Sequence, residues 1–218
     1  MKIKHKGVIF DLDGTLIDTL EDIGTNMNRA LRTRGFPELP IEQYRDKVGW
    51  GIKRLAFLAL PEEARQEETA ALVSGLASGF YAENPLVYTK PYPGIIELIA
   101  VLKRRKIKTA VLSNKPDAVA QKVIAGLFPL SSFDIVQGEV SGKKRKPDPG
   151  CVWDFLVSLG LTPSDVIFAG DSEVDMETAL ASGCFPMGVS WGYRSEETIV
   201  KAGARAIIKN PEELLNYL

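Results

Sequence analysis

The sequence predicts an α/β fold, a doubly wound parallel sheet that carries helices on both of its faces. Short apolar runs, each ended by polar residues or glycine, alternate with segments of helical periodicity along most of the chain. Strands that are followed repeatedly by helices form parallel sheets, because each helix returns the chain to the starting edge of the sheet. The alternation fails at residues 17–88, which indicates a helical insert directly after the first strand.

Six apolar runs are the predicted strands of this sheet. They lie at residues 7–10, 109–112, 133–136, 166–169, 185–189 and 206–208. Each has the length of a buried strand and is bounded by turn residues. The segments between the runs have helical spacing, and one of them places four apolar residues on a single helical face, namely Ile95, Leu98, Ile99 and Leu102. This succession predicts the parallel sheet.

The insert contains no convincing strand but several helical stretches. We expect them at residues 19–34, 51–60 and 62–81, with turn signals at residues 35–37 and at Pro61 between them. The α/β pattern resumes near residue 91. We therefore expect residues 1–16 and 89–218 to form the core domain, and residues 17–88 to form a separate helical domain.

The composition argues against binding to nucleic acid or to a membrane. Lys and Arg number 27 against 28 for Asp and Glu, so the net charge is close to zero. The two cysteines, Cys151 and Cys184, suit buried thiols in a reducing compartment. The basic start, residues 1–6, precedes an apolar stretch too short for a signal peptide. We expect a cytoplasmic protein that is a monomer or a homodimer.

Polar clusters follow four of the predicted strands, at the point where each strand ends. They comprise Asp11 and Asp13, then Ser113, Asn114 and Lys115, then the basic run 143–146 that ends in Lys146, and finally Asp171 and Asp175. Because the carboxyl ends of parallel strands form one edge of a sheet, where ligands bind, all four clusters should converge there. The convergence predicts a binding or catalytic site.

Each cluster taken alone also has a purely structural interpretation. Asn114, Asp171 and Ser172 precede predicted helices and are residue types that favour the N-cap position. The basic run 143–146 is typical of a solvated loop. Capping does not explain Asp11 and Asp13 at the end of a buried strand, however. Several carboxylates brought together repel one another and lose hydration unless a cation neutralises them.

The residue types favour phosphoryl transfer with Mg²⁺. Carboxylate and carbonyl oxygens are the ligands that Mg²⁺ prefers, and a lysine with a hydroxyl suits a phosphate. His5 is the sole histidine and lies near the N-terminus, and no Gly-x-x-x-x-Gly-Lys loop occurs. A carboxylate nucleophile remains, which would form an aspartyl phosphate on Asp11. Asp13 could then protonate the leaving alkoxide and later deprotonate the attacking water.

The four clusters resemble the motifs of the haloacid dehalogenase superfamily of phosphatases. The matching segments, in chain order, are residues 11–16 (DLDGTL), 113–116 (SNKP), 146–149 (KPDP) and 170–175 (GDSEVD). The match covers nearly the whole chain. It implies a Rossmann-like core sheet with a small α-helical cap domain inserted after the first strand.

The resemblance implies a role for each matching residue. Asp11 would be the nucleophile, Asp13 the general acid and base, and Lys146 the lysine that holds Asp11 and the phosphate. The phosphate would be bound by the backbone N–H groups of Leu12 and Asp13 and by Ser113, Asn114 and Lys146. Donors of this kind typically contribute about 3–4 kcal/mol each to stabilising a transition state.

The same resemblance implies a Mg²⁺ cofactor. The implied ligands are Asp11, the backbone carbonyl of Asp13, Asp171, and Asp175 either directly or through a water. In the insert, Arg45, Lys53 and Arg54 flank the loop around Trp50, where they could meet a substrate carboxylate when the cap closes. Trp50 lies between two glycines and could line the substrate pocket. Solvated helix faces are the structural alternative for the three cations.

The leading hypothesis is hydrolysis of a small phosphorylated metabolite. Within the superfamily, residues 113–116 and 48–51 most resemble phosphoglycolate phosphatases. A phosphosugar mutase or a pyrophosphatase of the same superfamily is the alternative enzyme. From another class, a receiver-like signalling module would need no large insert and would carry its phosphoacceptor on a later strand. A catalytically silent phosphate-binding protein would have no need for both Asp11 and Asp13.

Overall fold

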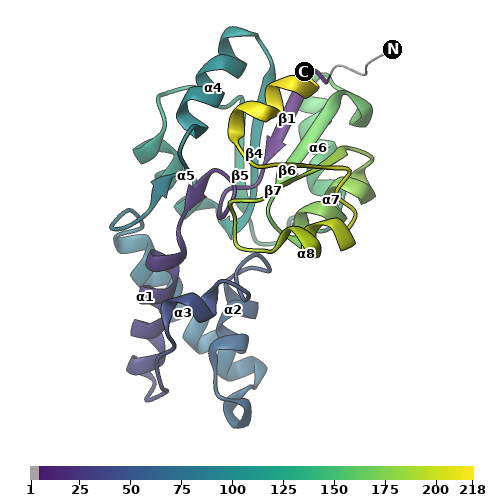
Figure 1. Cartoon of the computed structure of the whole chain (residues 1–218). Coiled ribbons are helices and arrows are strands. Elements are labelled where there is room, and N and C mark those ends of the chain that lie inside the picture. Colours follow the sequence, from purple (N-terminus) through teal and green to yellow (C-terminus); the bar gives the residue numbers. More distant parts are fainter. Residues whose placement is uncertain (1–4) are drawn as a thin grey trace.

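The computed structural model describes residues 5–218, so the first four residues of the basic start (residues 1–6) lie outside the described part. Six strands form one sheet in the order β5-β4-β1-β6-β7-β8, and all neighbours are parallel (Figure 1). The strands are β1 Gly7–Phe10, β4 Lys108–Pro116, β5 Ile135–Glu139, β6 Val166–Gly170, β7 Phe185–Val189 and β8 Ala206–Ile208. This sheet confirms the predicted α/β class.

Alternate residues of the central strands face two different apolar cores. Val8 and Phe10 of β1 pack with α4 (Ile95–Arg104) and α5 (Asp117–Leu127). Ile9 points to the other face and packs with α6 (Gly150–Leu159) and α7 (Glu173–Ser182). Successive side chains of a strand point to opposite faces, so a strand buried on both sides reads as one continuous apolar run. The helices on the two faces explain the apolar runs in the sequence.

The strand order places a crevice beside β1. The chain runs from β4 to β5 on one side of β1 and then crosses to β6, β7 and β8 on the other. In doubly wound sheets, ligands bind at the carboxyl ends of the strands where the order reverses. The remaining helices of the core are η3 Pro163–Asp165, α8 Glu196–Lys201 and η4 Pro211–Tyr217.

The insert is a group of helices that extends from the carboxyl edge of the sheet (Figure 1). It contains α1 Leu20–Thr33, η1 Ile41–Tyr44, α2 Ile52–Ala59, η2 Glu62–Ala64 and α3 Glu67–Glu83. Met27, Leu31, Tyr44 and Val73 belong to an apolar cluster of its own. A short antiparallel pair, β2 Ile17–Asp18 with β3 Lys90–Pro91, lies where the chain leaves and re-enters the core. The domain boundaries 16/17 and 88/89 stay a prediction.

Some predicted boundaries differ from the observed ones. The helix expected at residues 62–81 is divided into η2 and α3, because Gln66 between them is extended. Strand β4 continues past residue 112 to Pro116, where it pairs with Glu139 of β5 after a shift in register. Residues 113–115 are polar, so the strand prediction, which is based on apolar runs, ends at residue 112.

The cysteines and the helices of the described residues agree with the fold predicted from the sequence. Cys151 and Cys184 are buried and form no disulfide, as expected. Within residues 5–218, no helix has the length and apolarity needed to cross a membrane.

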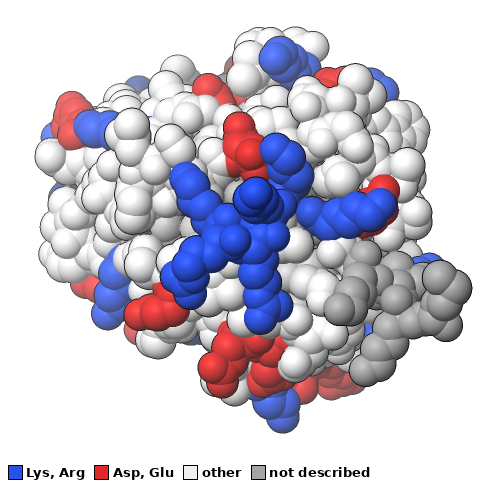
Figure 2. Space-filling view, turned by 90° about the horizontal axis from the view of Figure 1, so that it is seen from above, with Lys and Arg blue, Asp and Glu red and all other residues white. Residues whose placement is uncertain are grey.

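Figure 2 shows Lys and Arg side chains gathered on one face of the molecule. The last turn of α4 holds Lys103 and Arg104, where cations complement the helix dipole. The absence of a nucleic-acid partner stays a prediction.

Replacing Leu31 with alanine should destabilise the protein. Leu31 is fully buried in the apolar cluster of the insert, and loss of such a side chain leaves a cavity. The expected decrease in the free energy of unfolding is about 2–5 kcal/mol, measured by urea denaturation. The matched control is Leu130→Ala, because Leu130 is 94% exposed and its truncation should change stability by less than about 0.5 kcal/mol. Equal effects of the two variants would contradict the packing described.

Candidate active site

The carboxyl edge of the sheet brings the predicted polar clusters together around Lys146. Its Nζ donates to Oδ1 of Asp11 and to Oδ1 of Asp175, at 2.6 Å in each case. All three residues are buried. Burial alone would lower the pKa of Lys146, but the charges of Asp11 and Asp175 raise it above its ordinary value. Lys146 is therefore a permanently charged bridge between the end of β1 and the start of α7.

Three carboxylates share this site. Asp11, Asp171 and Asp175 each offer one oxygen, and these oxygens lie within 4.8 Å of one another. Burial, together with the charge of Asp175, raises the pKa of Asp171 to about 7. Burial and the charge of Asp175 also raise the pKa of Asp11, against the opposing effect of Lys146. One lysine cannot balance three buried carboxylates, so the donor set fits a divalent cation.

Backbone and small residues hold Asp171 in place. Its Oδ2 accepts a hydrogen bond from the backbone N–H of Tyr193 at 2.7 Å, and its Oδ1 accepts one from the hydroxyl of Thr15. A Cβ atom at Gly14 would collide with the Asp171 carboxylate, and one at Gly192 would collide with its Cβ. Gly14 also has a φ of 84°, which favours glycine. The glycines are required by the close approach of the chain to Asp171.

The capping interpretation of the sequence is wrong for Asp171 and Asn114. Ser172, not Asp171, is the N-cap of α7, and its backbone N–H and hydroxyl both donate to Oδ2 of Asp175. The N-cap of α5 is Pro116. Asn114 instead donates from its amide to the backbone carbonyls of Gly49 and Lys146. Both residues therefore serve the site and not a helix end.

The side chain of Asp13 turns away from the three carboxylates. Its Oδ1 accepts from the hydroxyl of Thr19 and pairs with Nζ of Lys115, both at 2.9 Å. Lys115 also donates to the hydroxyl of Tyr81, which lies on α3 of the insert. Burial would lower the pKa of Lys115, but Asp13 and Tyr81 raise it above its ordinary value. The hydroxyl of Tyr193 bonds Thr19 in turn.

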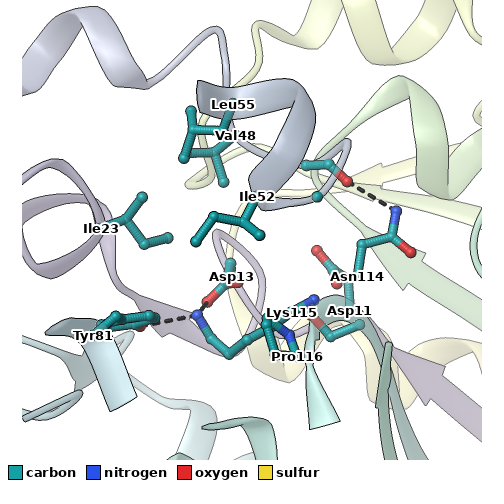
Figure 3. Close-up of a pocket in the computed structure, with 13 residues that line it drawn as sticks. Asp11, Asp13, Ile23, Val48, Ile52, Leu55, Tyr81, Asn114, Lys115 and Pro116 are labelled. Carbon is teal, nitrogen blue, oxygen red and sulfur yellow. Dashed lines mark hydrogen bonds and ion pairs between the residues drawn. The ribbon is translucent and has the colours of Figure 1, made fainter. Parts of the chain in front are cut away.

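A cavity of about 50 Å³ lies between the end of β1 and the insert (Figure 3). From the core, Asp11, Asp13, Ser113, Asn114, Lys115 and Pro116 line it. The insert contributes the side chains of Ile23, Val48, Ile52, Leu55 and Tyr81, together with Gly49 and Gly51. Most of the wall that the insert provides is therefore apolar.

The cap residues suggested by the sequence lie elsewhere. Arg45, Trp50 and Lys53 are not among the residues that line the cavity. Lys53 pairs with Glu67 at 2.8 Å on the surface, and Arg45 donates to the backbone carbonyl of Gly192 at 3.0 Å. Trp50 is half-buried. A contact of these side chains with substrate stays a prediction.

The sequence indicated that residues 191–194 could edge the site or pack against it, but it did not predict the contacts that join the insert to the site. Arg194 follows β7, and its guanidinium donates to the backbone carbonyls of Arg45 and Val48 and to the carboxylate of Glu173. Tyr81 reaches Lys115 across the same boundary. No local pattern marks these contacts, because the partners lie far away along the chain. Lys115 stood within a polar cluster, but its pairing with Asp13 was not foreseen.

Comparison with known proteins extends these observations. A family model described as haloacid dehalogenase-like hydrolase matches residues 8–189. The phosphoglycolate phosphatase of Aquifex aeolicus is 33% identical over 186 residues, which are 85% of each chain. That of Rhodospirillum rubrum is 33% identical and covers 98% of this chain and 90% of its own. A solved structure from Lactobacillus delbrueckii subsp. bulgaricus, a proposed phosphoglycolate phosphatase, is 32% identical with a TM-score of 0.92 over 99% of each chain.

Metal-free protein should lose stability as the pH rises. The pKa of Asp171 is about 7 in the folded state against about 3.9 when unfolded. Protonated Asp171 therefore stabilises the folded state fully below pH 4, and this stabilisation is lost as the pH rises through 7. The resulting decrease in the free energy of unfolding is roughly 2 kcal/mol or more. Urea denaturation in EDTA at pH 5 and pH 8 measures the loss.

The variant Asp171→Asn supplies the comparison for this pH effect. It removes one ionisable group from the site, so the decrease in the free energy of unfolding between pH 5 and pH 8 should be smaller than in the wild type. The exposed Asp154 gives a matched control, because Asp154→Asn should leave the wild-type decrease intact. An unchanged decrease in Asp171→Asn would contradict the assigned titration.

Proposed function

The chain belongs to the haloacid dehalogenase-like hydrolase family and is a phosphoric monoester hydrolase, and we propose that it hydrolyses a small phosphorylated metabolite through a phosphoryl group carried on Asp11. The observation that carries this mechanism is the buried bridge of Lys146 between Asp11 and Asp175, with Asp171 beside it. It fixes a carboxylate at the end of a parallel strand, within a group of acceptors suited to a cation.

Asp11 is the nucleophile of the proposed reaction. Lys146 holds its Oδ1, which fixes the orientation of the carboxylate. An oxygen of Asp11 forms a bond to phosphorus while the bond from phosphorus to the ester oxygen breaks. Ser113 lines the same cavity, and the backbone N–H groups of Leu12 and Asp13 have no acceptor within residues 5–218. These groups, with Lys146, are the proposed phosphate cradle.

The side-chain amide N–H groups of Asn114 are not free to bind the phosphate. Both of its donated hydrogen bonds go to backbone carbonyls, those of Gly49 and Lys146. A phosphate contact would therefore fall to its backbone N–H. The amide itself ties the loop of the insert to the loop that carries Lys146, so it positions two parts of the site.

Asp13 is the proposed general acid and base. Thr19 and Lys115 both bond its Oδ1, which leaves Oδ2 to carry the proton. In the first step Oδ2 gives this proton to the ester oxygen of the leaving group. In the second step it takes a proton from the water that attacks phosphorus, and Asp11 is released as a carboxylate.

We propose Mg²⁺ as the cofactor. Asp11, Asp171, Asp175 and the backbone carbonyl of Asp13 would hold it, and the carboxylate oxygens already lie within 4.8 Å of one another. Bound Mg²⁺ would offset the repulsion between the carboxylates and the phosphate. Burial and the repulsion between the carboxylates also raise the pKa values of Asp11 and Asp171, because both effects disfavour the charged forms.

The size of the cavity favours a small substrate. A water needs about 10–15 Å³ of such space, so a cavity of about 50 Å³ holds only a few small groups beside the reacting carboxylates. A hexose ring is larger, which favours hydrolysis of a short ester over a phosphosugar mutase. Phosphoglycolate, the substrate in the names of the relatives, has a small organic group.

Asp11→Asn should abolish phosphatase activity. The amide keeps the shape of the side chain but is no nucleophile, so kcat should fall by at least about 10⁴-fold. The measurement is phosphate release from a panel of small phosphate esters with Mg²⁺ and with EDTA, and wild-type activity should require the metal. Asp154→Asn is the matched control, since this aspartate is exposed on α6. Full activity of Asp11→Asn would overturn the mechanism.

Asp13→Asn should separate the two chemical steps. The nucleophile remains, but the proton donor and base are lost, so steady-state turnover should fall by about 10²–10⁴-fold. Rapid acid quenching and intact-protein mass spectrometry should still detect slow addition of one phosphoryl group. If this variant turned over normally, Asp13 would have no role in proton transfer.

A further inference from the structure

One cation lines the cavity, and the proposed mechanism uses it only to hold Asp13. Among the lining residues within the described part of the chain, Lys115 alone carries a positive charge. Its side chain is 2% exposed. An ammonium has three N–H donors, and Lys115 directs two of them to Asp13 and to the hydroxyl of Tyr81. The third donor has no partner among residues 5–218.

The rest of the wall offers no competing site for an anion on the substrate. Ile23, Val48, Ile52 and Leu55 form an apolar surface opposite the reacting carboxylates (Figure 3). None of the four cations of the nearby loop and helix lines the cavity, namely Arg45, Lys47, Lys53 and Arg54. Arg45 and Lys53 have other partners in Gly192 and Glu67. Among the residues that line the cavity, Lys115 is therefore the only cationic side chain that could pair with an anionic group on the organic part of the substrate.

The position of the Lys115 ammonium limits how far an anionic group on the substrate can lie from the phosphorus atom. Its Nζ is 2.9 Å from Oδ1 of Asp13, whose other oxygen is proposed to protonate the ester oxygen. Lys115 thus lies beside the leaving oxygen. A carboxylate one carbon away from this oxygen comes within reach of the ammonium, whereas a longer chain would extend toward Ile52 and Leu55.

We propose that Lys115 determines substrate specificity by pairing with a carboxylate on the carbon next to the ester oxygen, so that the preferred substrates are short phosphorylated 2-hydroxy acids. This inference rests on the proposed function and adds to it the residue that recognises the organic group. Tyr81 is a positioning residue in this arrangement, because its hydroxyl directs the ammonium of Lys115 from the insert. Substrate recognition therefore requires both the core and the insert.

The test compares three esters: 2-phosphoglycolate, ethyl phosphate, which lacks the carboxylate, and 3-phosphooxypropanoate, which is one carbon longer. For the wild type with Mg²⁺, kcat/KM for 2-phosphoglycolate should exceed that for each of the other two by at least about 10-fold. In Lys115→Met the ratio of 2-phosphoglycolate to ethyl phosphate should fall to within about 3-fold of unity. Lys201→Met, at an exposed lysine on α8, should keep the wild-type ratio.

The ratio distinguishes recognition from a merely structural role. If Lys115 only positions Asp13, its loss lowers kcat for both esters by the same factor and leaves the ratio unchanged, which would overturn the inference. Lys115→Gln repeats the measurement should the methionine variant fold poorly. The wild-type comparison needs no variant, and equal rates or a preference for ethyl phosphate would also overturn it. If the wild type hydrolysed no phosphate ester at all, the proposed function itself would fail.

Discussion

The bridge from Lys146 to Asp11 and Asp175 is the interaction on which the site depends. Burying three carboxylates costs free energy through lost hydration and mutual repulsion, and one ammonium compensates only part of that cost. The surrounding chain must therefore hold each carboxylate with directed donors. Ser172 does so for Asp175, and the backbone of Tyr193 does so for Asp171. The excess negative charge that remains makes this edge of the sheet receptive to a cation.

The helical insert and the reacting groups form one connected structure. Asn114 and Arg194 donate from the core to backbone carbonyls of the loop around residues 45–49, and Lys115 lies between Asp13 and Tyr81. Directed contacts of this kind have one optimal geometry, so the position of the insert and the orientation of Asp13 are linked. The core supplies the proposed phosphoryl-transfer groups, and the insert supplies the apolar wall that limits what can occupy the cavity.

The local sequence pattern predicted the structure correctly where a residue type has only one common structural role. Apolar runs marked the strands because both faces of the sheet are covered, and the polar residues after them lay at the carboxyl edge. Pattern was misleading at Asn114 and Asp171, whose types suit helix caps equally well. It also joined residues 62–81 into a single helix, although Gln66 is extended. In each case several local uses of the residue were compatible with the sequence, and tertiary contacts selected one.

The sequence by itself determined the α/β core, the helical insert and the aspartates and lysine of the four motifs, because each is expressed in residue type and short-range spacing. The tertiary structure decided the partners: that Asp13 pairs with Lys115, that Arg194 holds the insert, and that Arg45 and Lys53 lie away from the cavity. Three of these pairings join residues more than 100 positions apart, namely Asp13 with Lys115, Arg194 with Val48 and Arg45 with Gly192. The free energy of such contacts depends on distance and burial in the folded chain, which local spacing does not encode.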